Sequence, residues 1–338
     1  MLSRRGAAFA SRCLRASEAD AIQVMRILLT GAFGNLGLST LEELLRQGHQ
    51  VRCFVSRRKA HRRTARRFGG KIELVQGDMR EPADLAQAVQ GQEAIIHLAY
   101  ILPPESEDHP DLARAVNVDG TRYLLEAAQR LPTPPKFLFS SSFDVFGHTQ
   151  DQPPPRKVSD PVQATDHYSG HKLACEATIQ ASGLPWCILR FADIPPLGLR
   201  SPHPIMFRIP LATRFEVIHP HDAGLAVANA MHTEEVWGKI LLIGGGPTCQ
   251  MRYRDYLGRM LDLMGIGMLP ERAFGTEPYC TDWIDTEESQ RLLQYQRFSF
   301  DDIMAQLTRI VGYKRQLTVL VRPLARWYLL RMSPFYRA

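Results

Sequence analysis

Two side chains that could move a proton stand close together near the middle of the chain. Tyr168 and Lys172 lie four residues apart in the segment Y-S-G-H-K, a spacing that places both on one face of a helix. An ammonium group beside a phenol stabilises the phenolate and lowers the pKa of the tyrosine from its usual value of about 10. The pair therefore predicts a general acid or base that works near neutral pH.

A hydroxyl group that orients a substrate carbonyl would complete this chemistry, and Ser142 is the candidate. It ends a run of three serines that follows an apolar stretch at residues 136–139, which is predicted to be a buried strand. A tyrosine and a lysine at helical spacing also occur on ordinary helix surfaces. The interpretation therefore depends on whether the elements before them form a binding site.

Three glycines near the start of the chain predict a phosphate-binding loop. Gly31, Gly34 and Gly37 follow an apolar run at residues 26–29 and precede a helical pattern that stops at Gly48. A strand that turns on glycines into a helix aims free backbone N–H groups and the helix N-terminus at one point, where a phosphate can bind. Glycines with this spacing also form plain turns, so the loop alone is a weak indication of a dinucleotide site.

Strand and helix patterns alternate through the first half of the chain. Further strands are predicted at residues 49–55, 72–75 and 94–99, and helices at residues 84–89 and 112–130. This alternation is typical of an α/β fold with a Rossmann-type, doubly wound parallel sheet. From about residue 248 helical patterns dominate, which predicts a smaller, mainly helical C-terminal substrate lobe. His97, at a strand end, is interpreted as a packed histidine without a catalytic role.

The tip of the second predicted strand indicates which dinucleotide would bind. An acidic residue at this position would hold the ribose 2′-hydroxyl of NAD, whereas arginine nearby accepts the 2′-phosphate of NADP. The tip carries Val55, Ser56, Arg57 and Arg58 and no acid, so NADP is favoured over NAD. The alternative is that the basic run from Arg57 onward is only the solvated face of a helix.

The positive charge of the chain is concentrated in two segments. The net charge of +6 comes largely from seven Lys/Arg within residues 57–67 and from an acid-free segment after Lys314. This distribution does not form the broad basic stripe, interleaved with aromatic residues, that nucleic-acid binding predicts.

The six cysteines stand singly, which indicates a reducing compartment and no structural zinc. No apolar run approaches the length of about eighteen residues that a membrane span needs.

The last stretch, residues 316–338, mixes apolar and aromatic residues with basic ones. Such a segment could be an amphipathic helix that associates with a membrane surface or a partner. Packing against the body of the chain is the favoured interpretation. Pro323 would interrupt any single long helix there.

The first 24 residues are expected to lie outside the fold as a disordered extension. They contain several arginines and no acid before Glu18, as in a transit peptide, and Met25 stands directly before the first predicted strand. A cytoplasmic location is favoured, with the mitochondrial matrix as the alternative if this segment is a transit peptide. The dinucleotide-binding domain is predicted at residues 25–195, with 217–247 returning to it, and the substrate lobe at 196–216 and 248–338.

The order of these motifs resembles the extended short-chain dehydrogenase/reductase family, also called the NAD-dependent epimerase/dehydratase family. The resemblance covers about residues 25–250. The matching stretches are T-G-A-F-G-N-L-G from Thr30, G-D from Gly77, H-L-A from His97, N-V-D-G-T from Asn117, S-S-S-F-D-V-F-G from Ser140, Y-S-G-H-K from Tyr168, V-I-H-P-H-D-A-G from Val217 and I-L-L-I-G-G-G from Ile240.

The resemblance implies a role for each matching residue. Tyr168 would be the acid/base, Lys172 its pKa partner and ribose anchor, Ser142 the substrate hydroxyl donor, and Asn117 a supporting helix position. Family members often pair as dimers, so a homodimer is one expectation. The residues expected to bind the cofactor are Gly31, Phe33, Gly34, Asn35, Leu36, Gly37, Ser56, Arg57, Asp78, Met79, Leu98, Ala99 and Lys172.

Departures from the family pattern bear on the reaction. Family dehydratases carry an Asp-Glu pair after the catalytic hydroxyl residue, where this chain has Phe143 and Asp144, so elimination chemistry is not favoured. The stretch after Pro196 is short, which leaves fewer anchors for a nucleotide diphosphate. Arginines at 200, 208 and 214 could bind a phosphate, although solvated arginines are the simpler interpretation.

The expected function is that of an NAD(P)-dependent oxidoreductase or epimerase acting on a small molecule. A hydride would pass between the nicotinamide and a secondary alcohol or ketone carbon while Tyr168 moves the proton. One alternative is a nucleotide-sugar epimerase with tightly bound NAD. The other is a non-catalytic nucleotide-sensing or assembly protein on the same fold, which the presence of both Tyr168 and Lys172 disfavours.

Overall fold

A seven-stranded parallel sheet forms the centre of the chain. The computed structural model describes residues 23–198 and 201–336, so the predicted N-terminal extension lies almost wholly outside the described residues. The strands lie side by side in the order β3-β2-β1-β4-β5-β6-β8. The chain adds β2 and β3 on one side of β1 and the later strands on the other side, as in a doubly wound sheet. They are β1 (Arg26–Thr30), β2 (Gln50–Val55), β3 (Ile72–Gln76), β4 (Ala94–His97), β5 (Lys136–Ser142), β6 (Trp186–Phe191) and β8 (Lys239–Ile243).

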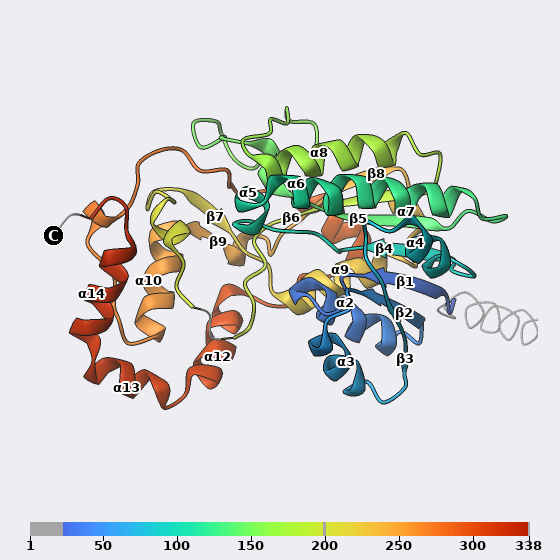
Figure 1. The fold of residues 1–338 in the computed structure, drawn as a ribbon. Helices are drawn as coiled ribbons and strands as arrows, with labels where there is room; N and C mark the ends of the chain where they lie inside the picture. The colour runs from blue at the N-terminus through green and yellow to red at the C-terminus, as the bar shows by residue number, and fades with distance from the viewer. Residues whose placement is uncertain (1–22, 199–200, 337–338) are drawn as a thin grey trace, which may run out of the picture.

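Helices cover both faces of this sheet (Figure 1). Successive side chains of a strand point to opposite faces, so Ile27 and Leu29 of β1 join one buried core while Leu28 joins another. Both cores need apolar residues, which explains why β1 is a continuous apolar run. The flanking helices are α2 (Asn35–Arg46), α3 (Lys59–Arg66), α4 (Pro82–Ala88), α5 (Glu105–Asp108), α6 (Pro110–Arg114), α7 (Gly120–Gln129), α8 (His167–Gln180), α9 (Pro220–Ala230) and α11 (Glu287–Leu293).

The helix predicted over residues 112–130 is not a regular α-helix. A π-helical turn, Ala115–Asp119, separates α6 from α7. Asn117 lies in this turn, and its side-chain amide exchanges hydrogen bonds with the backbone N–H and carbonyl of Ile101 at 2.8 and 3.0 Å. The wider turn thus fixes the loop after β4, a feature that apolar periodicity does not report.

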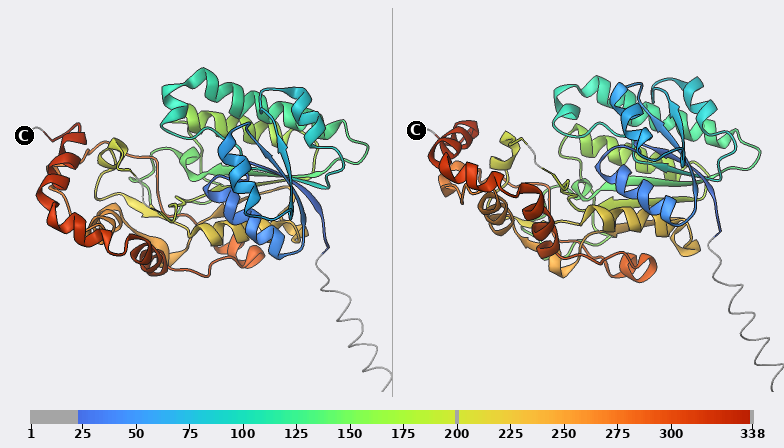
Figure 2. Two further views of the ribbon diagram at one scale, coloured as in Figure 1. Left: turned by 60° about the horizontal axis from the view of Figure 1, so that its bottom comes forward. Right: turned by 90° about the horizontal axis from the view of Figure 1, so that it is seen from below.

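The C-terminal lobe lies beyond the carboxyl ends of the strands (Figures 1 and 2). It has its own apolar core, in which Phe207, Tyr253, Leu261, Phe300 and Leu307 are buried. Its mainly helical character confirms the prediction. Its principal elements are the antiparallel pair β7 (Arg214–Glu216) and β9 (Gln250–Arg252), with α10 (Tyr253–Leu263), α12 (Phe300–Val311), α13 (Lys314–Leu320) and α14 (Arg322–Met332).

The prediction that residues 316–338 pack against the body of the chain holds for only part of the last two helices. Leu329 of α14 is buried in the core of the lobe, whereas Leu320 and Leu324 are exposed. Within the described parts of the chain, no helix has both the length and the hydropathy to cross a bilayer.

Candidate active site

The glycine loop between β1 and α2 is shaped by close backbone contacts. Gly31 has a φ of +68°, and a Cβ atom there would lie 2.7 Å from the backbone nitrogen of Ala99. A Cβ atom on Gly37 would lie 2.1 Å from the carbonyl oxygen of Gly31. Gly34 is less crowded, since a Cβ atom there would lie 3.4 Å from its nearest neighbour, the carbonyl oxygen of Gly31. Only glycine permits this path, which brings the start of α2 directly beside the end of β1.

The N-terminus of α2 is suited to an anion. Its N-cap residue, Gly34, provides no capping side chain, and its first turn has no acidic residue. Uncapped N–H groups and the helix dipole therefore favour a phosphate at this position. Thr30 supports the loop from below, because its hydroxyl accepts hydrogen bonds from the N–H groups of Leu98 and Ala99 at 3.2 and 3.1 Å. The loop thus fits the pyrophosphate of a dinucleotide.

The Gly37→Ala variant is expected to lower the affinity for NAD(P)H by at least about tenfold, because the new methyl group must displace the carbonyl of Gly31. The measurement is titration calorimetry, together with thermal unfolding. Gly258→Ala in α10 is the matched control, since no atom lies within 4 Å of its added Cβ. Unchanged affinity in Gly37→Ala would show that this loop does not hold the cofactor.

The predicted adenosine-binding residues lie at the ends of β2 and β3. Ser56 and Arg57 follow β2, and the Arg57 guanidinium bonds to both carboxylate oxygens of Asp84 at 2.8 and 3.0 Å. Asp78 follows β3 and bonds to Arg80, whose guanidinium holds the pKa of the Asp78 carboxyl below its usual value. Of the other predicted contacts, Phe33 stacks with Phe68 and the side-chain amide of Asn35 donates to the carbonyl of Ile194, whereas Met79 is buried in the core that contains Leu28.

The three residues predicted to carry the proton chemistry lie together at the carboxyl end of β5. Ser142 is the last residue of β5, and Tyr168 and Lys172 lie on the first two turns of α8. All three are buried. The Lys172 ammonium donates to the carbonyl of Ser140 at 2.6 Å and lies 5.6 Å from the centroid of the Tyr168 ring. Helical spacing and the sheet topology thus bring the set together as predicted.

The predicted effect of Lys172 on the pKa of Tyr168 is wrong for the protein alone. Burial raises the pKa of Tyr168 above its usual value, and hydrogen bonding to Ser142 offsets only part of the rise. Burial also lowers the pKa of Lys172 to about 7. The ammonium points at the Ser140 carbonyl and the ring of Tyr100, 3.4 Å from its centroid, rather than at the phenol oxygen. Desolvation therefore outweighs the charge of Lys172.

Two residues that the sequence did not single out help to place this set. Tyr100 follows β4 and packs edge-on against Tyr168, with ring centroids 5.8 Å apart. Glu107 accepts the N–H groups of His167 and Tyr168 at 3.1 and 3.0 Å and so fixes the start of α8. Tyr100 could have been found from its position at a strand end. Glu107 lies sixty residues from its partner and has no local signal.

Asp144 lies beside Ser142 and Tyr168. It is half-buried, and burial together with the nearby Asp166 raises the pKa of its carboxyl to about 7. Its backbone N–H donates to the Ser142 hydroxyl at 3.3 Å. A carboxyl group that ionises near neutral pH next to a buried tyrosine is typical of an acid/base site.

The pH dependence of stability is expected to reflect Asp144. Because its pKa is raised in the folded state from 3.8 to about 7, the stabilisation associated with its protonation is present below pH 4 and is lost as the pH rises through 7. The Asp144→Asn variant should therefore gain stability relative to the parent as the pH increases from 4 to 8. Thermal unfolding across this range is the measurement, with exposed Asp262→Asn as control. Parallel pH profiles for parent and Asp144→Asn would contradict this assignment.

Of the three arginines considered as a phosphate site from the sequence, Arg214 is already paired within the protein. Arg214 is buried, and its Nε donates to the carboxylate of Asp282 at 2.5 Å, so its charge is already neutralised and it is not solvated. Arg208 is exposed, and Arg200 lies outside the described residues.

His97 is confirmed as a packed residue. It is buried, and its two ring nitrogens lie 2.7 Å from the hydroxyl of Thr30 and 2.9 Å from the hydroxyl of Thr121.

Comparison with known proteins agrees with this architecture. In solved structures, the UDP-glucuronic acid 4-epimerase from Bacillus cereus, in complex with UDP-glucuronic acid and NAD, has a TM-score of 0.71 at 20% identity and covers 87% of this chain and 100% of its own. A short-chain dehydrogenase/reductase superfamily protein from Agrobacterium tumefaciens with bound NAD has a TM-score of 0.69 at 19% identity, over 88% of this chain and 99% of its own. At these identities the likeness shows the fold.

Curated relatives match a shorter part of the chain. Sterol demethylase protein B from Methylococcus capsulatus is 33% identical over 123 residues, which is 36% of each chain. D-erythronate dehydrogenase from Cupriavidus necator is 33% identical over 130 residues, 36% of this chain and 40% of its own length. The chain thus matches about two fifths or less of these two relatives. Residues 27–195 match the family described as "NAD dependent epimerase/dehydratase family", and the chain belongs to this family.

Proposed function

We propose that the chain is an NAD(P)-dependent oxidoreductase that acts on a secondary alcohol or ketone carbon, with Tyr168 as the general acid/base. The observation that carries this proposal is the placement of Ser142, Tyr168 and Lys172 at the carboxyl edge of the sheet that also carries the glycine loop. Ligands of doubly wound sheets bind at this edge. The nicotinamide, when bound, supplies or accepts the hydride.

The side chains of this set have complementary tasks. In the reducing direction the phenol of Tyr168 donates a proton to the carbonyl oxygen as the carbon gains a hydride, and in oxidation Tyr168 accepts that proton back. The hydroxyl of Ser142 orients the same oxygen. Lys172 would anchor the ribose next to the nicotinamide from its buried position beside Ser140. Asn117 holds the loop after β4 beside them through the backbone of Ile101.

The direct test follows the cofactor through purification and turnover. Mass spectrometry of the protein as purified, followed by NADPH oxidation assays with ketones, distinguishes the proposal from an epimerase. An oxidoreductase consumes one free NAD(P)H for each ketone reduced. A nucleotide-sugar epimerase retains NAD and consumes none, because it returns the hydride to its own substrate. Turnover of a nucleotide sugar without net NAD(P)H consumption would favour the epimerase. The pairing of Arg214 with Asp282 disfavours it, because this arginine is then not available to bind the diphosphate of a nucleotide sugar.

A preference for NADP over NAD is part of the proposal. Residues 55–58 at the tip of β2 include no acid, and the Arg57 side chain there is 62% exposed although it is paired with Asp84 from α4. A guanidinium at this place can bind a 2′-phosphate, whereas residues 55–58 offer no acid to the ribose 2′-hydroxyl of NAD.

The Arg57→Ala variant is expected to raise the KM for NADPH by about tenfold or more and to leave the KM for NADH nearly unchanged, because a charge-assisted bond is lost only with the phosphorylated cofactor. Steady-state kinetics with both cofactors is the measurement, with Arg63→Ala on the exposed face of α3 as the matched control. Equal KM values for NADH and NADPH in the parent, unaffected by Arg57→Ala, would remove the NADP preference.

A further inference from the structure

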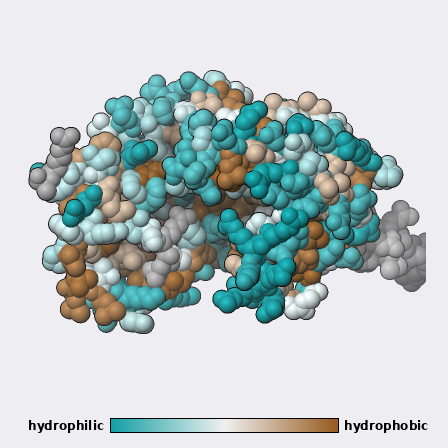
Figure 3. Space-filling model, in the orientation of Figure 1, coloured by the Kyte–Doolittle hydropathy of each residue, from teal (hydrophilic) through white to brown (hydrophobic). Residues whose placement is uncertain are grey.

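The helices α13 and α14 expose an apolar face at the outer end of the C-terminal lobe. Leu317 and Leu320 of α13, and Leu324, Trp327 and Tyr328 of α14, are each more than half exposed. The spacing of three or four residues within each helix places these side chains on one side of it. Figure 3 shows a hydrophobic area at the corner of the molecule where Figure 1 places these helices. We refer to these five residues as the apolar face.

Other contacts fix these helices so that the apolar face points outward. Leu329 of α14 is buried in the core of the lobe. The Arg326 guanidinium donates to the carbonyls of residues 266–268 at 2.8 to 3.0 Å, and the hydroxyl of Ser333 donates to the carbonyl of Ala273 at 2.6 Å. The inner side of α14 therefore already has partners, and the apolar face is not held toward the lobe.

The segment that carries the apolar face is cationic and contains no acidic residue. No Asp or Glu follows Asp302 in the sequence. Among the described residues none of the cations of this segment forms an ion pair with a carboxylate, and Arg331 instead lies over the Trp327 ring, 4.8 Å from its centroid. These cations are Lys314, Arg315, Arg322, Arg326 and Arg331.

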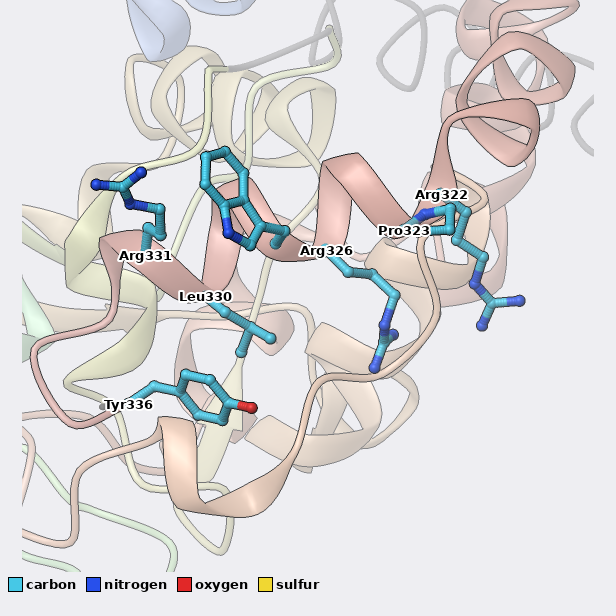
Figure 4. A pocket seen from close by; sticks show the side chains of 7 residues that line it. Arg322, Pro323, Arg326, Leu330, Arg331 and Tyr336 are labelled. Carbon is cyan, nitrogen blue, oxygen red and sulfur yellow. The ribbon is translucent and has the colours of Figure 1, made fainter. Parts of the chain in front are cut away.

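A groove of about 720 Å³ runs beside the apolar face on α14. It is lined by Pro323, Leu330 and Tyr336 together with three arginines, 322, 326 and 331. Figure 4 shows Leu330 and Tyr336 between Arg331 and Arg326 in this view. The lining of the groove therefore combines apolar side chains with guanidinium groups, as a phosphate group that carries an apolar chain would require.

We propose that α13 and α14 dock on the surface of a bilayer that contains anionic lipids. The apolar face would enter the boundary between headgroups and acyl chains, and the exposed cations Lys314, Arg315 and Arg331 would bind lipid phosphates. Trp327 and Tyr328 are residue types that favour this boundary. A second copy of the chain fits less well, because it would bring two of these cationic, acid-free segments together.

The test measures binding of the full chain to vesicles. Phosphatidylcholine vesicles that contain phosphatidylglycerol should retain the protein in a flotation assay, and vesicles of phosphatidylcholine alone should retain far less. Binding should weaken as the salt concentration rises, since exposed charges are screened. The emission of Trp327 should shift to shorter wavelength on binding, and this shift should disappear in Trp327→Phe.

Variants separate the apolar from the charged contribution. Leu324→Glu should lower the vesicle affinity by more than about tenfold, and Arg331→Gln by about fivefold. Val158→Glu, an exposed apolar residue far from these helices in the sequence, is the matched control and should bind like the parent. Thermal unfolding should be nearly unchanged in all three, because the replaced side chains are exposed.

Three results would overturn the proposal. The first is equal binding to vesicles with and without phosphatidylglycerol. The second is unchanged binding by Leu324→Glu. The third is a dimer in light scattering that Leu324→Glu converts to a monomer while the parent binds no vesicles, which would assign the apolar face to a second copy of the chain.

Discussion

The Tyr168→Phe variant is expected to lower kcat by about 10²–10⁴-fold, the usual contribution of a positioned general acid or base. The phenol is the proton donor in the proposed reduction, and burial raises its pKa so that it is protonated at neutral pH. The ring itself remains in Tyr168→Phe, so its edge-on packing against Tyr100 is kept. Cofactor affinity and thermal stability should therefore change little. Stopped-flow measurement of hydride transfer, with calorimetry for the cofactor, checks both parts.

Tyr100→Phe is the matched control for this experiment. Its hydroxyl lies 3.8 Å from the Cys175 sulfur, and its removal should lower kcat by less than about tenfold. Activity at the parental level in Tyr168→Phe would contradict the catalytic assignment and favour a non-catalytic role for the chain. Equal losses in both tyrosine variants would indicate that the pair acts through packing rather than through proton transfer.

Local sequence patterns predicted the elements that position this chemistry. The apolar run before Gly31, the three glycines and the helical spacing after them were sufficient to predict β1, the loop and α2, because each feature depends on residues within one short segment. The strand β5 and the helix α8 could be predicted in the same way. The seven-stranded sheet confirms the expected fold class.

Long-range contacts were beyond what the patterns could predict. Arg214 and Asp282 are 68 residues apart, and neither has a neighbour that indicates the pair. The π-helical turn at Asn117 depends on the backbone of Ile101, which apolar spacing does not report. The pKa of Tyr168 depends on how completely the tertiary structure excludes water. Sequence spacing places Lys172 near the ring, but it does not show that the ammonium points at Ser140 and Tyr100 instead.

A buried ion pair between β6 and α8 is another contact that no local sequence pattern indicates. Arg190 of β6 and Glu176 of α8 are each less than 5% exposed, and two nitrogens of the guanidinium bond to the carboxylate at 3.0 and 2.7 Å. Ser141, next to Ser142, donates its hydroxyl to the same carboxylate at 2.6 Å. The pair therefore links α8, which carries Tyr168, to β5 and β6.

The Glu176→Gln variant is expected to lose about 3–5 kcal/mol of unfolding free energy, because the Arg190 guanidinium remains buried without its counter-charge. Denaturant unfolding is the measurement. Glu288→Gln is the matched control, since its partner Lys239 lies at 2.6 Å but both side chains are more than 40% exposed, and such a surface pair contributes about 1 kcal/mol or less.

The Arg190→Met/Glu176→Leu double variant shows whether charge or packing is responsible. Removal of both charges leaves no unpaired ion, so this variant should recover most of the stability that Glu176→Gln loses. It also removes the acceptor of the Ser141 hydroxyl, and that loss should shift Ser142 relative to Tyr168 and lower kcat even where the fold is stable. If the double variant is as unstable as Glu176→Gln, the two side chains stabilise the fold by their shape. If the double variant is fully active, Ser142 keeps its position without the ion pair.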